Sequence, residues 1–182
     1  DAGDDATAGG SYAAELADGG GLSLREALAL ASAGGKTVGF AAGLGGQTIT
    51  LSANAAVPDG TTFDADAAGT LTISDNALVL AGLLSVSNGT GDTLALNANL
   101  SGAGSLSKSG AGTLSLSGAN TYTGTTTVTG GMLTIGSDNH LGAGAVTLHG
   151  GTLNLQSSTG SRTVDNAVLL GASGGTVRVT SD

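Results

Sequence analysis

Three aspartates have the types and spacing that best suit catalysis. Asp64 and Asp66 lie two residues apart, so a short strand would place both carboxylates on one face, and Asp75 follows nearby. Such a pair could serve a polysaccharide hydrolase or lyase, or could bind Ca²⁺. Sugar-binding sites also use aromatic side chains, yet the chain has no Trp, two Tyr and two Phe. We therefore favour solvated, outward-facing carboxylates.

Two further groups could bind metal ions. The run NGTGD at Asn88–Asp92 matches one fragment of a Gly-rich calcium-binding nonapeptide, and a single incomplete copy is weak support. Asp138, His140 and His149 have ligating side chains, but two histidines on neighbouring loops are more often turn residues. No G-x-S-x-G run is present. We assign no catalytic, cofactor-binding or metal-binding residue.

Composition excludes several classes of protein. The net charge is −9 with only five Lys and Arg, which argues against binding to nucleic acid or anionic membranes. No apolar run reaches about 20 residues, and the absence of cysteine excludes disulfides and cysteine-ligated metals. A polysaccharide enzyme would need a cleft with clustered charges, whereas the cationic residues are scattered: Arg25, Lys36, Lys108, Arg162 and Arg178.

Any such residues must be positioned by a repeating unit of about 20 residues. Triplets with two apolar residues around a small or polar one recur, which is the pattern of a strand with one buried face. Their first members are 22, 23, 20, 19, 20 and 24 residues apart. The triplets begin at Ile49, Leu71, Leu94, Leu114, Leu133, Leu153 and Val177.

Two more tracks keep the same step. The second contains Leu78, Leu100, Tyr122 and Leu141, and the third contains Leu84, Leu106, Val128 and Val146. Antiparallel hairpins would reverse the order of the tracks, so three tracks in step predict a parallel β-helix with three short strands per coil. Tyr122 is expected in the core rather than on a ligand platform.

Pairs of threonines raise one more candidate function. The pairs are Thr48/Thr50, Thr70/Thr72 and Thr121/Thr123. A flat T-x-T ladder on every coil would suggest ice binding. The middle position of the first track varies among Thr, Ala, Ser, Asn and Arg, so we expect the ladder to be broken.

The corners of the coils carry their own signals. An Asn follows the start of each of five first-track strands by five or six residues, and Asn tolerates the left-handed conformation of a sharp corner. We expect these side chains to hydrogen-bond to one another along the axis, so that Asn99 matters more than Asn88, which lies off this series. Glycine two residues before a first-track strand permits a tight corner. The corner residues are Asn54, Asn76, Asn99, Asn120 and Asn139, with Gly69, Gly112, Gly131, Gly151 and Gly175.

Residues 21–35 contain the strongest helical signal. Ser23 and Glu26 form a capping box, Leu22 and Ala27 occupy hydrophobic-staple positions, and Gly34 suits the C-terminal cap. Apolar side chains then repeat at helical spacing at Leu24, Ala27, Leu28 and Ala31. A helix over about 23–33 would cover the exposed end of the first coil.

Two segments resemble known families. Residues 102–156, with Thr-Leu-Ser-Leu-Ser-Gly-Ala-Asn-Thr-Tyr-Thr-Gly at 113–124, resemble the passenger-associated repeat of bacterial autotransporters. Ser23–Ala27 is similar to the Ser-Leu-Arg-Glu-Ala module that opens secreted β-helix proteins, with Leu22 where a Cys is common. The resemblance implies a right-handed β-helical passenger exported across the outer membrane of a Gram-negative bacterium. It brings no catalytic residues.

The expected organisation is a single β-helix domain over 1–182, with a cap in 1–36 and coils in 37–182. A strand pattern runs up to Asp182, so we expect the N-terminal segment of a longer chain with a translocator barrel further on. The favoured function is a rod-like segment of a cell-surface adhesin, acting through a surface ligand or self-association, without nucleic acid, cofactor or insertion of this segment into a membrane. The alternative is a polysaccharide-active β-helix enzyme. The adhesion partner, and any role of Asp64 and Asp66 beyond solubility, stay open.

Overall fold

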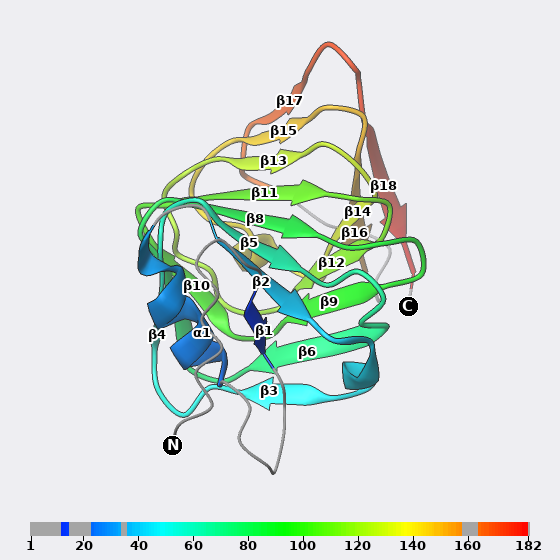
Figure 1. Cartoon of the computed structure of the whole chain (residues 1–182). Helices are drawn as coiled ribbons and strands as arrows, with labels where there is room; N and C mark the ends of the chain where they lie inside the picture. Colours follow the sequence, from blue (N-terminus) through cyan, green and yellow to red (C-terminus); the bar gives the residue numbers. More distant parts are fainter. Residues whose placement is uncertain (1–11, 15–22, 34–35, 158–163, 182) are drawn as a thin grey trace, which may run out of the picture.

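The chain is described by a computed structural model covering residues 12–14, 23–33, 36–157 and 164–181. Within these ranges it winds as a right-handed parallel β-helix (Figure 1). The helical elements are α1 (Leu24–Leu30) and the 3₁₀ turns η1 (Ala31–Ala33), η2 (Ala42–Leu44) and η3 (Asp138–His140). The strands are β1 (Tyr12–Ala14), β2 (Thr37–Phe40), β3 (Thr48–Thr50), β4 (Ala55–Val57), β5 (Thr61–Asp64), β6 (Thr70–Ser74), β7 (Ala77–Leu80), β8 (Leu83–Ser87), β9 (Thr93–Leu96), β10 (Asn99–Gly102), β11 (Ser105–Ser109), β12 (Thr113–Leu116), β13 (Thr126–Val128), β14 (Met132–Ile135), β15 (Val146–Leu148), β16 (Thr152–Gln156), β17 (Val168–Leu170) and β18 (Thr176–Thr180).

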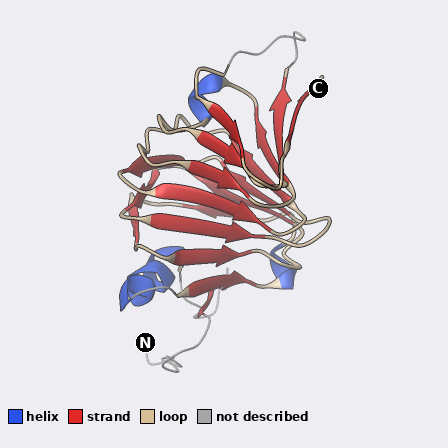
Figure 2. Ribbon diagram, turned by 90° about the horizontal axis from the view of Figure 1, so that it is seen from above, coloured by secondary structure: helices blue, strands red, loops and turns tan. Residues whose placement is uncertain are grey.

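Strands of successive coils stack side by side into parallel sheets (Figures 1 and 2). In the described part of the chain there are three sheets. The first runs β1-β2-β5-β8-β11-β13-β15-β17, the second runs β3-β6-β9-β12-β14-β16-β18, and the third contains only β4, β7 and β10. The predicted fold class is therefore confirmed.

The core is built from columns of identical or similar side chains. In the second sheet Leu71, Leu94, Leu114, Leu133 and Leu153 occupy paired positions on neighbouring strands and are fully buried. Burying one such side chain contributes roughly 1.5–3 kcal/mol. Each inward residue therefore stabilises the stack only when the next coil covers it.

Pairing departs from the predicted tracks at two places. Ile49 pairs with Ile73, 24 residues later, and not with Leu71. Val128 pairs with Lys108, while Leu106 pairs with Thr126. Both shifts are two residues long, so the side chains still face inward and the apolar pattern alone does not reveal them.

The third sheet stops after three coils, so the expectation of three strands in every coil is wrong for the later ones. Tyr122 and Leu141, which continue the second track, are buried but lie outside any strand. Leu84 and Leu106 are paired across 22 residues, whereas Leu106 and Thr126 are paired across 20. The shorter coils turn this corner without a third strand.

The N-terminal helix lies against the edge of the third sheet, beside β4 (Figure 1). The helix residues Leu24, Ala27 and Leu28 are buried. The Ser23 hydroxyl accepts a hydrogen bond from Glu26 N, and the Glu26 carboxylate accepts one from Ser23 N at 2.8 Å, which lowers the pKa of Glu26. The capping box and the helix itself are thus confirmed, although α1 ends at Leu30 and η1 follows. Leu22 and Gly34 lie outside the described residues.

Candidate functional site

The acidic residues gather at the corner that leads from the first sheet to the second. Asp64 ends β5, and its Oδ1 accepts a hydrogen bond from Asp66 N at 3.1 Å. Asp92, one coil later, accepts from Ala67 N and Gly69 N, both at 2.8 Å. The two carboxylates of Asp66 and Asp92 both lie beside Gly89. Asp92, which sequence reasoning treated only as part of a calcium motif, therefore braces the corner below it.

Asp75 does not join this group. It follows β6 at the corner between the second and third sheets, where it has φ 60° and its carboxylate accepts a hydrogen bond from the Ser74 hydroxyl. Its neighbour Asn76 has φ 44°. The structure thus brings Asp64 and Asp66 together and places Asp75 at a different corner, where it supports a left-handed turn.

The candidate calcium motif at 88–92 holds its own loop by hydrogen bonds. Asn88 is fully buried, and its Nδ2 donates to the carbonyl oxygens of Asp92 at 3.2 Å and Thr113 at 2.5 Å. The Asp92 carboxylate is already engaged by two backbone N–H groups of the coil below. Among the described residues, no group of three or more His, Cys, Asp or Glu is arranged to hold a metal ion.

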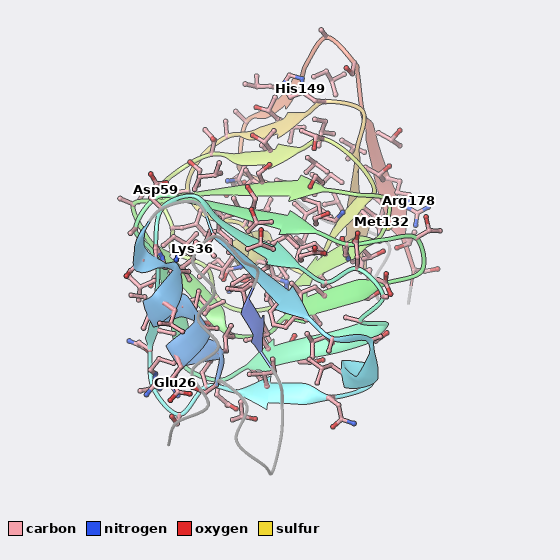
Figure 3. The ribbon with its side chains drawn as sticks, in the orientation of Figure 1. Glu26, Lys36, Asp59, Met132, His149 and Arg178 are labelled. Atoms are coloured by element: carbon pink, nitrogen blue, oxygen red, sulfur yellow. The ribbon has the colours of Figure 1, made fainter. Side chains whose placement is uncertain are left out.

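The histidines of the other candidate metal group lie at different corners. His140 lies in η3 after β14, and its Nδ1 accepts a hydrogen bond from Gly136 N at 3.1 Å. His149 follows β15 in the first sheet and is exposed (Figure 3). The two imidazoles therefore belong to different corners, and Asp138 lies in η3 with His140.

Four of the five corner asparagines bind the backbone of neighbouring coils, whereas the sequence led us to expect that they bind one another. The exception is Asn139, whose Oδ1 accepts from the Ser137 hydroxyl. Asn54 Oδ1 accepts from Ala77 N, and Asn99 Oδ1 accepts from Ala119 N. Asn120 does both, because its Oδ1 accepts from Leu100 N at 2.7 Å and its Nδ2 donates to the His140 carbonyl at 2.6 Å. Each of these four amides satisfies a backbone group that the corner leaves unpaired.

Tyr122 is a core residue, as expected. Its side chain is fully buried, and its hydroxyl lies 2.6 Å from the Thr126 hydroxyl oxygen. Burial raises the pKa of Tyr122, partly opposed by the hydrogen bond to Thr126. It offers no aromatic surface to a sugar.

The outward faces of both large sheets are rich in hydroxyls. On the first sheet, paired outward positions are occupied by Thr37, Thr62, Ser85, Ser107, Thr127 and Thr147. On the second, the corresponding column reads Thr70, Thr93, Thr113, Met132, Thr152 and Thr176. The predicted T-x-T pairs at Thr48/Thr50 and Thr70/Thr72 lie on strands, whereas Thr121/Thr123 does not.

Sequence reasoning examined the middle of each triplet and missed these columns. The signal was one position earlier, where Thr precedes the apolar residue in five of the six second-sheet strands β6, β9, β12, β14, β16 and β18. Near the C-terminal end, the Arg178 side chain extends across the column on the second sheet (Figure 3). Its Nε donates to Asn154 Oδ1 at 3.0 Å, and its guanidinium lies 3.4 Å from Met132 Sδ.

Lys108 is another residue that the sequence analysis did not single out. It was counted among the scattered cations, yet its side chain is fully buried in the first sheet. Lys108 pairs with Val86 on one neighbouring strand and with Val128 on the other. Its Nζ donates to the carbonyls of Ser109 and, at 3.1 Å, of Gly110. Burial lowers the pKa of Lys108 to about 8, against an opposing effect of the Asp66 charge. Arg162 lies outside the described residues.

Within the described residues, no helix has the length and apolar character needed to cross a membrane.

Two comparisons with known proteins each match part of the chain. The family model of the passenger-associated-transport-repeat matches residues 106–135, which run from β11 to the end of β14. A stretch of 88 residues, 47% of the chain, is 35% identical to the adhesin BmaC autotransporter of Brucella suis biovar 1 (strain 1330). The chain spans about 2% of the length of that curated relative. No solved structure matches.

Residues 106–135 are thus similar to an autotransporter passenger repeat, and 88 residues of the chain are similar to part of an autotransporter adhesin.

Proposed function

We propose that this chain is a structural and interaction segment of a bacterial cell-surface adhesin. The single observation that carries the proposal is the coincidence of the stacked, parallel coils with the passenger repeat at 106–135 and an adhesin relative. Stacked coils give a stiff rod whose length grows coil by coil. Contact with a ligand or with other cells is then made by outward side chains and corner loops.

The outward faces support a contact role more than a catalytic one. Hydroxyl side chains line both large sheets, and the carboxylates at the acidic corner accept backbone hydrogen bonds. The second candidate, a polysaccharide-active enzyme, depends on Asp64 and Asp66. Their separation by one corner residue leaves them in a loop that is internally hydrogen-bonded.

The protein would be exported across the outer membrane and displayed at the cell surface, with a translocator barrel elsewhere in the full-length protein. A host strain should display the full passenger, the passenger lacking these coils, or the translocator alone. We expect attachment to surfaces, or cell clumping, with the full passenger and its reduction when these coils are deleted at equal surface expression. Equal attachment by all three strains would overturn the proposal.

The enzyme alternative has its own test with the purified protein. Turnover of a panel of acidic and neutral polysaccharides should be absent. Turnover that disappears in Asp64→Asn or Asp66→Asn, while cell attachment is unchanged, would replace the adhesin proposal with an enzymatic one.

A further inference from the structure

The corner between the first and second sheets contains a buried amine. Lys108 occupies an inward column whose other members are Phe63, Val86, Val128 and Leu148, and none of its side-chain surface is exposed. The strands β8 and β13 on either side carry no ionisable side chain. An ammonium group in such a column is unfavourable unless it is strongly compensated. Here its assigned partners are two neutral backbone carbonyls, of Ser109 and Gly110.

A buried carboxamide lies in the same corner, one coil below. Asn88 is also fully buried. Its Nδ2 is held by the Asp92 and Thr113 carbonyls, which orients the carboxamide. Among the buried side-chain nitrogen and oxygen atoms of the described residues, only Asn88 Oδ1 has no hydrogen-bond partner. An unsatisfied buried acceptor is costly and calls for a specific explanation.

The two groups face the same short turn, Gly110–Gly112. A Cβ on Gly110 would lie 2.3 Å from the Asn88 carbonyl oxygen, so the two backbones are in direct contact. A Cβ on Gly112 would lie 3.0 Å from Asn88 Cγ, and Lys108 Nζ lies 3.1 Å from the Gly110 carbonyl oxygen. Glycine at both positions places no side chain in this turn, where the Gly110 carbonyl binds the amine and Gly112 lies against the carboxamide.

A carboxylate completes the corner. Asp66 Oδ1 would lie 3.6 Å from a Cβ on Gly89, the residue that follows Asn88, and the charge of Asp66 acts on Lys108. A carboxylate beside an amine and an amide can move a proton between them.

We propose that Lys108 and Asn88 are joined by an intramolecular isopeptide bond between adjacent coils. The Lys108 Nζ lone pair adds to Asn88 Cγ and forms the new C–N bond. The Cγ–Nδ2 bond breaks, and Nδ2 leaves as ammonia with a proton that comes from Nζ through the Asp66 carboxylate. No oxidant, reductant or further reactant is needed.

The surroundings favour each requirement of this reaction. Burial depresses the pKa of Lys108 to about 8, so a useful fraction of the amine is neutral and nucleophilic near neutral pH. Burial and the two Nδ2 hydrogen bonds hold the carboxamide in one orientation. The product replaces a buried charge by a neutral amide, which removes the cost of keeping an ammonium group inside the β-helix.

The bond is tested by intact mass and by amine labelling of the purified protein. The chain has only two lysines, Lys36 and Lys108. After incubation at mildly alkaline pH, we expect the mass to fall by one ammonia molecule. In denaturant, an amine-reactive reagent should then label Lys36 but not Lys108, and fragmentation should show Lys108 joined to Asn88.

Variants separate this bond from the other reaction open to an Asn-Gly pair, closure of Asn88 onto the Gly89 nitrogen to a succinimide, which also releases ammonia. Lys108→Arg keeps the positive charge and should abolish the mass loss, while the matched control Lys36→Arg should keep it. Asp66→Asn should slow the reaction at least several-fold. An unchanged mass with Lys108 labelled, or a mass loss that persists in Lys108→Arg, would overturn the proposal.

Discussion

Asn88 Nδ2 donates a hydrogen bond across 2.5 Å to the carbonyl oxygen of Thr113, in the coil above. The side chain thereby links two coils from inside the β-helix. Asn99, which belongs to the predicted asparagine series, makes its link from an exposed position, where Oδ1 accepts from Ala119 N at 2.9 Å. Because Asn88 is buried and Asn99 is exposed, we now expect the reverse of the ranking that sequence spacing suggested for these two residues.

The first prediction compares alanine substitutions at these two sites. Asn88→Ala removes two hydrogen bonds and leaves a cavity, so we expect it to lower the free energy of unfolding by about 2–3 kcal/mol. Asn99→Ala exposes its backbone partner to water and should cost at most about 1 kcal/mol. Urea denaturation of both variants measures the difference. A larger loss at Asn99 would restore the original ranking.

The second prediction concerns pH and applies to chains in which the Lys108 amine is free. The folded pKa of about 8 lies below the ordinary value of 10.5, so between these values the unfolded chain binds more protons. The free energy of unfolding should therefore rise as pH increases from 8 towards 10.5, by at most about 3 kcal/mol from this residue. Below pH 8 both states are protonated and the folded state bears the full cost.

Lys108→Met is the matched variant for this prediction. It should be at least as stable as the parent at pH 7, because it places an apolar side chain in an apolar column. Its stability should also lack the rise between pH 8 and 10. A parallel rise in parent and variant would assign the effect to another group.

The third prediction concerns the covering helix. Leu24 and Leu28 are buried against the first coils, whereas Leu30 on the same helix is 37% exposed. The double change Leu24→Asp and Leu28→Asp should cost more than about 4 kcal/mol, through lost burial and buried charge. It should also promote self-association through the uncovered edge of β4.

Leu30→Asp serves as the control on the same helix. It should change the melting temperature little and leave the protein monomeric by light scattering. A double variant that melts like the parent and does not associate would show that α1 is dispensable for closing this end.

The fourth prediction uses two glycines. A Cβ on Gly104 would lie 2.1 Å from the Gly82 carbonyl oxygen and 2.6 Å from Leu80 Cβ, so Gly104→Ala should force neighbouring coils apart and cost about 1–3 kcal/mol. Gly39 has no neighbouring atom within 4 Å of such a Cβ. Gly39→Ala should therefore change stability by less than about 0.5 kcal/mol. Thermal melting of the two variants decides whether contact between coils sets the requirement for glycine.

Much of the fold followed from the sequence because a stacked coil repeats its own constraints. The leucines from Leu71 to Leu153 recur at nearly constant spacing, and the structure pairs them as expected. The capping box at Ser23 and Glu26 is local and was equally readable. The predicted register was wrong at Ile49 and Val128, because a shift of two residues keeps the same side of the strand buried.

The corner chemistry could not be predicted in the same way. Whether Asn88 and Lys108 face inward depends on the path of the chain through a corner, and their residue types usually indicate exposure. The acidic corner could be predicted in part, because Asp64 and Asp66 lie two residues apart in the sequence. Asp92 joins them only because a later coil stacks on the same corner.

The strand pairing between coils also governs how such a protein can change its length. Each strand aligns with one about 20 residues away, as Leu114 does with Leu133 and Leu133 with Leu153. Duplication of one whole coil would extend the rod by about 4.8 Å and leave every inward column continuous. Insertion of a single residue within a strand would turn its apolar side chains outward. A β-helix of this design can therefore change in length only by discrete steps, and residues 117–125 form a short corner that contains no strand.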